Sequence, residues 1–235
     1  MRYGQFCPIA KATEILGERW TILIVRELLL GARRFNELQR GLGDISPALL
    51  TQRLRALELN GLLVRRRVPG GRQLEYFPTE ACTALLPTII GMGEWGLLWA
   101  RNTVLDPELD VDLLMLYIER SIDPAELPGA ETVIKFRFTD LQGQQDFWLL
   151  VRDGGVELCI VDPGRDIDVY FNCTLRTMHD VWMGERSYRA AFEDGDLRVD
   201  GIPALTRNIS RWLKRSVLAE APRTPWPRAE VPAAA

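Results

Sequence analysis

The chain has 235 residues, of which 47% are hydrophobic and 26% charged, with a formal net charge of −3. This profile is typical of a globular protein with room for one large domain or two modest ones. No apolar run reaches the roughly 20 residues that span a bilayer, and the first residues lack the apolar core and cleavage site of a signal peptide. We therefore expect a cytoplasmic protein without a membrane partner.

The charge is distributed unevenly along the chain. Residues 1–78 hold 13 Lys and Arg against 7 Asp and Glu, a surplus of +6, whereas residues 79–235 hold 16 against 25, a balance of −9. Such asymmetry indicates two modules with different partners. The basic part suits a polyanion, and the acidic part would repel one.

Helical periodicity begins close to the N-terminus. Apolar residues recur at steps of three and four from about Pro8 to Leu30, which predicts a helix. Gly17 could bend this helix or divide it into two, and Gly31 is a suitable stop. A short second helix is predicted from Phe35 to Arg40.

The next segment carries helix-start and helix-stop signals. Ser46 before Pro47 is an N-cap followed by a proline at the first helical position, and Asn60 with the glycine after it ends the helix. "LLVRRRV", "PGG" and "RQLEYFP" then predict strand, turn and strand. Helix, helix, turn, helix and ribbon are the order of a winged helix-turn-helix, which binds duplex DNA through one helix in the major groove.

The helix after Ser46 is the predicted reading helix. When its leucines face the core, the opposite face carries Ala48, Thr51, Gln52 and Arg55. Gln52 could pair with adenine, and Arg55 with guanine or a phosphate. Ala48 or Thr51 could contact a thymine methyl group.

Basic residues flank this helix and suit phosphate contacts. Together with Ser46, they complete the predicted DNA-binding set: Arg33, Arg34, Arg53, Arg65, Arg66, Arg67 and Arg72. Because side chains alternate along a strand, Arg65 and Arg67 share one face of the ribbon and Arg66 takes the other. Any single arginine could equally be a solvated charge, so the prediction depends on the whole set.

Several short motifs in residues 5–100 together resemble the HxlR family of winged-helix transcriptional regulators, relatives of the MarR proteins. The matching blocks are Cys7-Pro8, Gly17 with Trp20, "RRFNEL", "ISPALLTQRL", "NGLLVRR" and "EYFPTE". The resemblance implies a homodimer that binds double-stranded operator DNA near promoters. The chain departs from the family pattern at the ribbon tip, which lacks a proline before its Glu-Tyr pair, and at Ala81-Cys82, where a glycine is more usual.

A long helix is predicted from Thr79 to about Thr103, weakened by Pro87 and several glycines. Trp95 and Trp99 lie four residues apart on it, which favours packing at a dimer interface over a ligand-stacking stripe. The sequence "DPELD" that follows predicts a junction between two domains.

The second half predicts an α+β domain. Four strand candidates, "ETVIKFRFT", "DFWLLVRD", "GVELCIVD" and "DVYFNCT", suggest an antiparallel meander. Helices predicted at Val111–Arg120, Leu175–Met183 and Pro203–Leu218 could cover this sheet. Residues 221–235 are rich in Pro and Ala and are expected to be a disordered tail.

This arrangement, with "WMGERSYRAAFEDGDLRVDG" and the helix after it, resembles the sterol-carrier-protein fold, which encloses an apolar, lipid-sized cavity. The resemblance covers about residues 110–220 and implies a sensor whose effector is an apolar small molecule. A domain that is structural or only dimerises is the alternative. The predicted organisation is α+β: a winged helix-turn-helix DNA-binding and dimerisation domain (1–104), a sterol-carrier-like domain with an antiparallel sheet covered by helices (105–220), and the tail (221–235).

Catalytic and metal sites are not predicted. His179 is the one histidine, with no cysteine near it in sequence, and the chain has no nucleotide-binding motif and no recognisable nucleophile–base pair. We therefore expect no enzyme activity, no metal and no cofactor. The four cysteines are widely spaced and are expected to be thiols. Cys7, at a helix start where the dipole favours a thiolate, is a candidate redox sensor, although simple packing would also explain it.

The sequence therefore predicts a dimeric transcriptional regulator. Two winged helices would bind a pseudo-palindromic operator, and an apolar ligand in the second domain would bias the distance between the two reading helices, provided that it prefers one dimer geometry. The alternative is a lipid-binding or carrier protein whose winged helix mediates protein contacts. The salt dependence of DNA binding separates the two.

Overall fold

The computed structural model describes residues 3–67, 74–100 and 109–221. The chain forms two compact units, residues 1–93 (unit 1) and 94–235 (unit 2). Helices and strands occur in both units, which agrees with the predicted α+β class. The sequence-based boundary after residue 104, Arg72 at the ribbon tip and the predicted tail from residue 222 onward lie outside the described residues.

Unit 1 begins with four helices: α1 (Pro8–Leu16), α2 (Thr21–Leu29), α3 (Phe35–Leu42) and α4 (Pro47–Leu59). The predicted first helix is therefore divided into two. The chain turns between them at Gly17–Trp20, where Trp20 adopts the left-handed conformation with φ 77°. Gly31 ends α2 with φ 98°, a value that glycine adopts without a Cβ clash.

The predicted boundaries of α4 are confirmed. The Ser46 hydroxyl accepts a hydrogen bond from the Leu49 N–H at 3.3 Å, and Pro47 occupies the first turn. At the other end, Gly61 has φ 72° and lets the chain turn into the ribbon. These local signals fix where the reading helix begins and ends.

The core of unit 1 lies between these helices. Most of its buried members come from α2, α3 and α4, and they include Ile24, Leu28, Leu38, Leu50, Leu54 and Leu57. The leucine stripe of α4 thus faces inward as predicted. Burying it leaves the opposite face of α4 to solvent.

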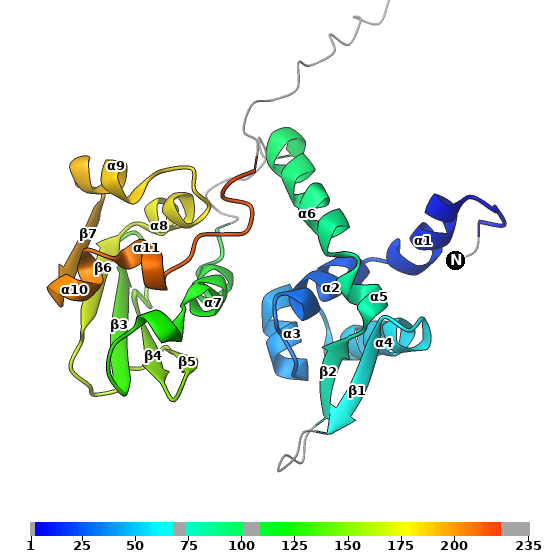
Figure 1. Cartoon of the computed structure of the whole chain (residues 1–235), viewed down its shortest axis with the longest axis horizontal. Coiled ribbons are helices and arrows are strands. Elements are labelled where there is room, and N and C mark those ends of the chain that lie inside the picture. The colour runs from blue at the N-terminus through cyan, green and yellow to red at the C-terminus, as the bar shows by residue number, and fades with distance from the viewer. Residues whose placement is uncertain (1–2, 68–73, 101–108, 222–235) are drawn as a thin grey trace, which may run out of the picture. The chain divides into compact units, whose positions relative to one another are not determined.

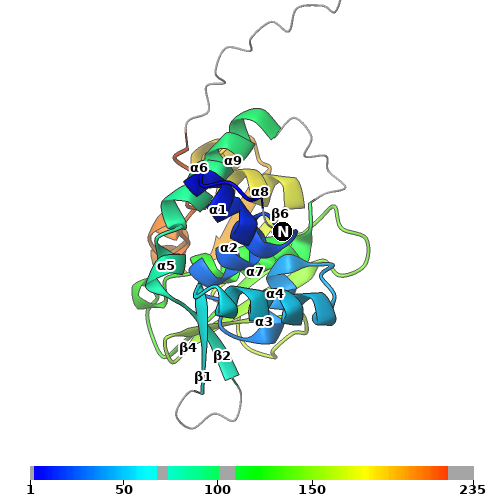
Figure 2. The ribbon, with the colours of Figure 1, turned by 90° about the vertical axis from the view of Figure 1, so that its right-hand side faces the viewer.

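A two-stranded antiparallel ribbon follows α4. It comprises β1 (Leu63–Arg67) and β2 (Leu74–Pro78), with Arg65 opposite Tyr76. The Tyr76 N–H also donates to the Arg33 carbonyl at 2.8 Å, which ties the ribbon to the loop before α3. Figures 1 and 2 both show the ribbon projecting from the helices as a wing.

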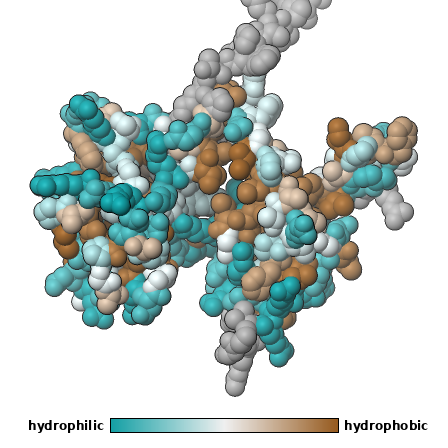
Figure 3. All heavy atoms as spheres, viewed as in Figure 1, coloured by the Kyte–Doolittle hydropathy of each residue, from teal (hydrophilic) through white to brown (hydrophobic). Residues whose placement is uncertain are grey.

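The helix predicted from Thr79 onward is interrupted rather than continuous. It comprises α5 (Glu80–Thr83), α6 (Leu86–Trp95) and a π-helical turn, η1 (Gly96–Ala100). By length and composition the stretch Glu80–Trp99 would suffice to cross a membrane, which corrects the expectation that no segment is long and apolar enough. Little of it is buried, and Figure 3 shows apolar side chains gathered along α6. Such a surface also suits packing against another protein chain.

Unit 2 is built around one five-stranded sheet, in the order β5-β4-β3-β6-β7. Its strands are β3 (Glu131–Phe138), β4 (Asp146–Arg152), β5 (Gly155–Cys159), β6 (Val169–Cys173) and β7 (Leu197–Gly201). Its helices are α7 (Val111–Ser121), the 3-10 turn η4 (Pro124–Glu126), α8 (Leu175–Trp182), α9 (Tyr188–Glu193), α10 (Pro203–Thr206) and α11 (Ile209–Trp212). Neither β7 nor α9 was predicted.

The prediction of an antiparallel sheet is wrong for one pair of strands. β3 and β6 are parallel, with Phe136 opposite Phe171. A strand with alternating apolar residues has the same pattern whether it pairs parallel or antiparallel, so the sequence does not reveal the direction of pairing. The chain instead returns through residues 160–168 before β6, and the Asp168 carboxylate accepts a hydrogen bond from the Val133 N–H at 2.8 Å. This contact anchors the start of the parallel strand.

The predicted helix Pro203–Leu218 is also wrong. Only α10 and α11 form there, because the chain leaves the helix after Trp212 and makes long-range contacts. Leu213 bridges to Ile122, and the Lys214 N–H donates to the Ser121 carbonyl at 2.8 Å. These bonds to the end of α7 replace the helical ones.

One face of the sheet packs against α7, α8 and α11, which lie beside it in Figure 1. In the centre of this core the Phe136 and Phe171 rings stack at 4.6 Å between centroids, and Trp212 meets Phe171 edge-on at 6.1 Å. On the other face a smaller group is buried, formed by Val133, Trp148 and Leu150. This second face is only partly covered, because Lys135 is half-buried and Arg137 is exposed on it.

Candidate nucleic-acid interface

The exposed face of α4 carries the predicted base-reading residues. Ala48, Gln52 and Arg55 are exposed. Within the described ranges Gln52 and Arg55 make no hydrogen bond or ion pair, so their polar groups are available to a ligand. Thr51 is half-buried, and its hydroxyl donates to the Pro47 carbonyl at 2.8 Å. The methyl group of Thr51 is then the part free to contact a base.

The two arginines before α3 have partners within unit 1. Arg33 caps the end of α2, because its Nη1 donates to the Leu28 carbonyl at 2.7 Å. Its guanidinium also lies 5.7 Å from the Phe77 ring centroid. Arg34 is exposed, and its Nε donates to Glu75 Oε1 of β2 at 3.1 Å. Arg33 therefore fastens helix and wing together, while Arg34 lies at the surface beside them.

The wing arginines alternate as predicted. Arg65 forms an ion pair with Glu58 of α4, with 2.7 Å between Nη2 and Oε2. The hydrogen bond and the charge of Glu58 raise the pKa of Arg65 above its usual value. Arg66 takes the other face, 6.0 Å from the Phe77 ring. Arg67 is exposed, with no ion pair to another described residue.

Arg53 differs from its neighbours on α4. Its Nε donates to the Arg19 carbonyl and its Nη2 to Glu18 Oε2, each at 3.0 Å. Sequence reasoning identified the arginines but missed their carboxylate partners, which also include Glu58 and Glu75. These partners lie between 7 and 41 residues away along the chain, so no local periodicity could have found them.

The four cysteines occupy different environments. Cys7 is the N-cap residue of α1 and is half-buried, at the helix start predicted for it. Cys82 is fully buried, and burial raises its pKa. Burial likewise raises the pKa of Cys159, and it raises the pKa of Cys173 to about 12. Among the four cysteines, Cys7 is the one that occupies a helix N-cap position.

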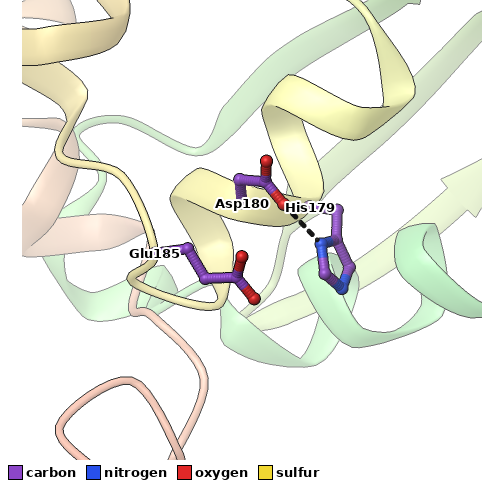
Figure 4. A group of neighbouring side chains, drawn as sticks. All are labelled: His179, Asp180 and Glu185. Carbon is purple, nitrogen blue, oxygen red and sulfur yellow. Dashed lines mark hydrogen bonds and ion pairs between the residues drawn. The ribbon is translucent and has the colours of Figure 1, made fainter. Parts of the chain in front are cut away.

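One group in unit 2 combines side chains of the types that bind metals. His179, Asp180 and Glu185 lie around the end of α8, with their ligand atoms within 4.8 Å of one another, and Figure 4 shows how they converge. Asp180 Oδ1 is already 2.9 Å from His179 Nδ1 and 3.9 Å from Arg176 Nη1. The Asp180 carboxylate therefore already interacts with two side chains of the protein, His179 and Arg176.

The comparisons with known proteins concern less than half of the chain. The family model described as HxlR-like helix-turn-helix matches residues 15–104. YvaP, an HTH-type transcriptional regulator of Bacillus subtilis, is 36% identical over 108 residues, which cover 45% of this chain and 100% of YvaP. Rv3095 of Mycobacterium tuberculosis, with the same description, is 43% identical over 91 residues, which cover 37% of this chain and 56% of Rv3095.

A solved structure is similar to part of the chain. The reduced form of the transcriptional regulator YodB from B. subtilis is 31% identical, covers 43% of this chain and 100% of its own, and has a TM-score of 0.37. The segment matched by the family model includes α2, α3, α4 and both strands of the wing. The exposed face of α4 therefore lies within the matched segment.

Proposed function

This chain belongs to the HxlR-like helix-turn-helix family of transcriptional regulators, and we propose that it reads operator DNA as a homodimer with α4 in the major groove. The observation that carries the proposal is the exposed face of α4, where Gln52 and Arg55 have no partner among the described residues. Either side chain can make paired hydrogen bonds to a purine. Unsatisfied donors on a helix that is rigidly capped by Ser46 suit direct readout.

The phosphate contacts are proposed for exposed arginines around α4. Arg67 is the readiest, and Arg34, Arg65 and Arg66 lie on the same unit with partners that a phosphate could replace. An arginine in an exposed ion pair loses little by this exchange, since such pairs contribute only about 0–1 kcal/mol in water. Arg72, which falls between the two strands of the wing in the sequence, completes the proposed set with Ser46 at the helix start.

The dimer is proposed to form through α1 and α6. Neither helix has a fully buried residue within the described chain. The exposed apolar side chains on and next to them are Phe6, Ile9, Leu86, Met92, Trp95 and Trp99. So large an apolar surface is costly in water and is typical of an interface between chains. Pairing two copies would also set the spacing of two reading helices.

Two inputs are proposed for regulation. The first is an apolar small molecule bound by unit 2, which the resemblance to sterol carriers and the apolar sheet support. It can act only if it prefers one dimer geometry. The second is oxidation or alkylation of Cys7, supported by its position at the N-cap of α1. The rival function is a lipid carrier whose winged helix contacts protein.

The test of the proposal is enrichment of duplexes from a random-sequence library by the full chain, followed by footprinting of the best duplex. We expect a pseudo-palindromic footprint and an affinity that falls steeply with salt, because each phosphate contact releases counterions. Binding that is absent, or that does not change with salt, would favour the lipid carrier. Footprints with and without cell lipid extract then test the effector.

A further inference from the structure

Arg53 is the one arginine among the described residues of α4 that is turned back onto unit 1. Its guanidinium donates to two groups in the corner between α1 and α2: the Arg19 carbonyl and the Glu18 carboxylate, both at 3.0 Å. Only 16% of its side-chain surface is exposed. Arg55, two residues further along the same helix, is exposed and has no such partners. Arg53 therefore makes contacts within unit 1, whereas Arg55 is exposed to a ligand.

The corner that Arg53 contacts determines where α1 lies. No residue of α1 is fully buried, and Ile15 and Leu16 at its end pack against the core of unit 1. The direction of the rest of α1 therefore depends on the corner that joins it to α2. That junction contains Trp20 in the left-handed conformation, which is unusual for a large side chain. The Thr21 N–H donates to the Glu18 carbonyl at 3.0 Å, and the Arg19 guanidinium lies 5.1 Å from the Trp20 ring. The corner is thus a compact turn, and Arg53 fastens it to α4.

We propose that Arg53 is a positioning residue, which ties the reading helix α4 to the corner between α1 and α2 and makes no phosphate contact in the DNA complex. A phosphate would have to replace both a charge-assisted hydrogen bond and a backbone contact, made by a guanidinium whose side chain is only 16% exposed. The planar guanidinium makes both bonds at once, in a geometry that a lysine does not reproduce. The inference rests on the proposed function, because it assigns a role within DNA reading.

The link has a consequence for regulation. α1 carries Cys7 at its N-cap and is one of the two helices proposed to form the dimer. A displacement of α1 would reach α4 through the corner and Arg53, and would turn the face that carries Gln52 and Arg55. Coupling of this kind needs an element that responds to both sites. Arg53 supplies the contact between them.

The experiment compares Arg53→Lys, Arg53→Gln and Arg55→Lys in the full chain. For each variant we would measure affinity for the duplex that the wild-type chain enriches most strongly and for a scrambled duplex, at several salt concentrations. We expect both Arg53 variants to lose about ten-fold in the ratio of the two affinities, the effect of losing one charge-assisted hydrogen bond. Their salt slope should match that of the wild type. A phosphate contact would instead let Arg53→Lys keep its affinity, and Arg53→Gln would lower the slope by about 0.9.

The substitution Glu18→Ala changes DNA binding in opposite directions for the two possible roles of Arg53. If Arg53 positions α4, removing its partner lowers the ratio of affinities and adds little to the effect of Arg53→Gln. If Arg53 contacts phosphate, the same change frees it and strengthens binding to both duplexes equally. Glu58→Ala is the matched control, because it removes the same charge from a partner of Arg65. We expect it to leave the ratio unchanged.

Amide hydrogen exchange tests the contact between Arg53 and the corner in the absence of DNA. We expect the Thr21 amide to exchange faster in Arg53→Lys than in the wild type, and to be unchanged in Arg55→Lys. If the wild-type chain enriches no duplex, the proposed function fails, while the exchange data still test the contact. If Arg53→Lys has wild-type exchange, ratio and salt slope, the positioning role is overturned.

Discussion

The carboxylate of Glu27 in α2 lies directly against Gly41 in α3. Glu27 has no exposed surface, and a Cβ at position 41 would stand 1.9 Å from its Oε2. Arg26 completes the contact: its Nε donates to Glu27 Oε1 at 2.9 Å and its Nη2 to the Gly41 carbonyl at 3.0 Å. A buried charge and a glycine thus hold together the helices that support the reading helix.

Gly41→Ala should therefore destabilise the protein. The added methyl group overlaps a buried carboxylate that has little room to move, and such overpacking costs roughly 1–3 kcal/mol. Urea unfolding followed by circular dichroism measures it. Gly155→Ala is the control, because a Cβ there meets only the Arg152 carbonyl, at an ordinary contact distance of 3.6 Å. The control should be neutral or stabilising by up to about 1 kcal/mol, and equal losses in the two variants would contradict the steric explanation.

Gln52→Ala and Arg55→Ala should weaken specific binding more than non-specific binding. Each side chain stands free on the exposed face of α4, and a paired base contact contributes roughly 1–3 kcal/mol of discrimination. Arg67→Ala should instead weaken all duplexes alike and flatten the salt slope. Competition gel shifts at several salt concentrations decide between them. Equal loss for selected and scrambled DNA in Gln52→Ala would show that this residue does not read bases.

Trp95→Glu should shift the protein from dimer to monomer. Trp95 is 62% exposed in the single chain, so a charge is harmless in the monomer but would be buried without a partner in the proposed interface. Sedimentation equilibrium across a range of protein concentrations measures the change. Leu59→Glu, at the exposed end of α4, is the control and should leave the assembly as it is. A dimer that survives Trp95→Glu would place the interface elsewhere.

Cys7 should react first with iodoacetamide at neutral pH. Burial raises the pKa of Cys82 and of Cys173, the latter to about 12, so both stay protonated inside the fold. An unfolded Cys173 would ionise near 9.0. Stability from this group is therefore present below that pH and is lost as the pH rises toward about 12.

Mass spectrometry of the native protein at several labelling times gives the order of reaction. Labelling of Cys173 should appear only with unfolding, and earlier at alkaline pH. Cys7→Ser should remove the fast phase and leave the slower ones. If Cys82 or Cys159 is labelled before Cys7, the proposed sensing role loses its chemical basis.

An apolar ligand bound to unit 2 should copurify with the full chain. The sheet face toward the helices is apolar throughout its buried cluster, so it offers a fatty or aromatic molecule contact but few polar anchors. Native mass spectrometry detects a bound species, and titration with fatty acids should change the affinity for the enriched duplex. A chain that binds none of these probes would make unit 2 a packing or dimerising module, and Cys7 would be the remaining proposed input.

The local features of unit 1 were determined by the sequence itself. The spacing of Leu50, Leu54 and Leu57 defined the buried side of α4, and Ser46 with Pro47 defined its start. These signals act within one or two helical turns, because capping and amphipathic burial depend on near neighbours along the chain. The identity of the exposed residues on α4 followed from them.

Tertiary structure decided the features that depend on distant parts of the chain. Arg53 and Arg55 look alike in the sequence, but only Arg53 meets Glu18, 35 residues away. The parallel pairing of β3 with β6 and the ending of α11 at Trp212 likewise depend on hydrogen bonds to remote segments. Side-chain periodicity indicates which face of a helix or strand is buried. It does not indicate which segment packs against that face or whether two strands pair parallel or antiparallel. These features are determined only when distant segments come together in the folded chain.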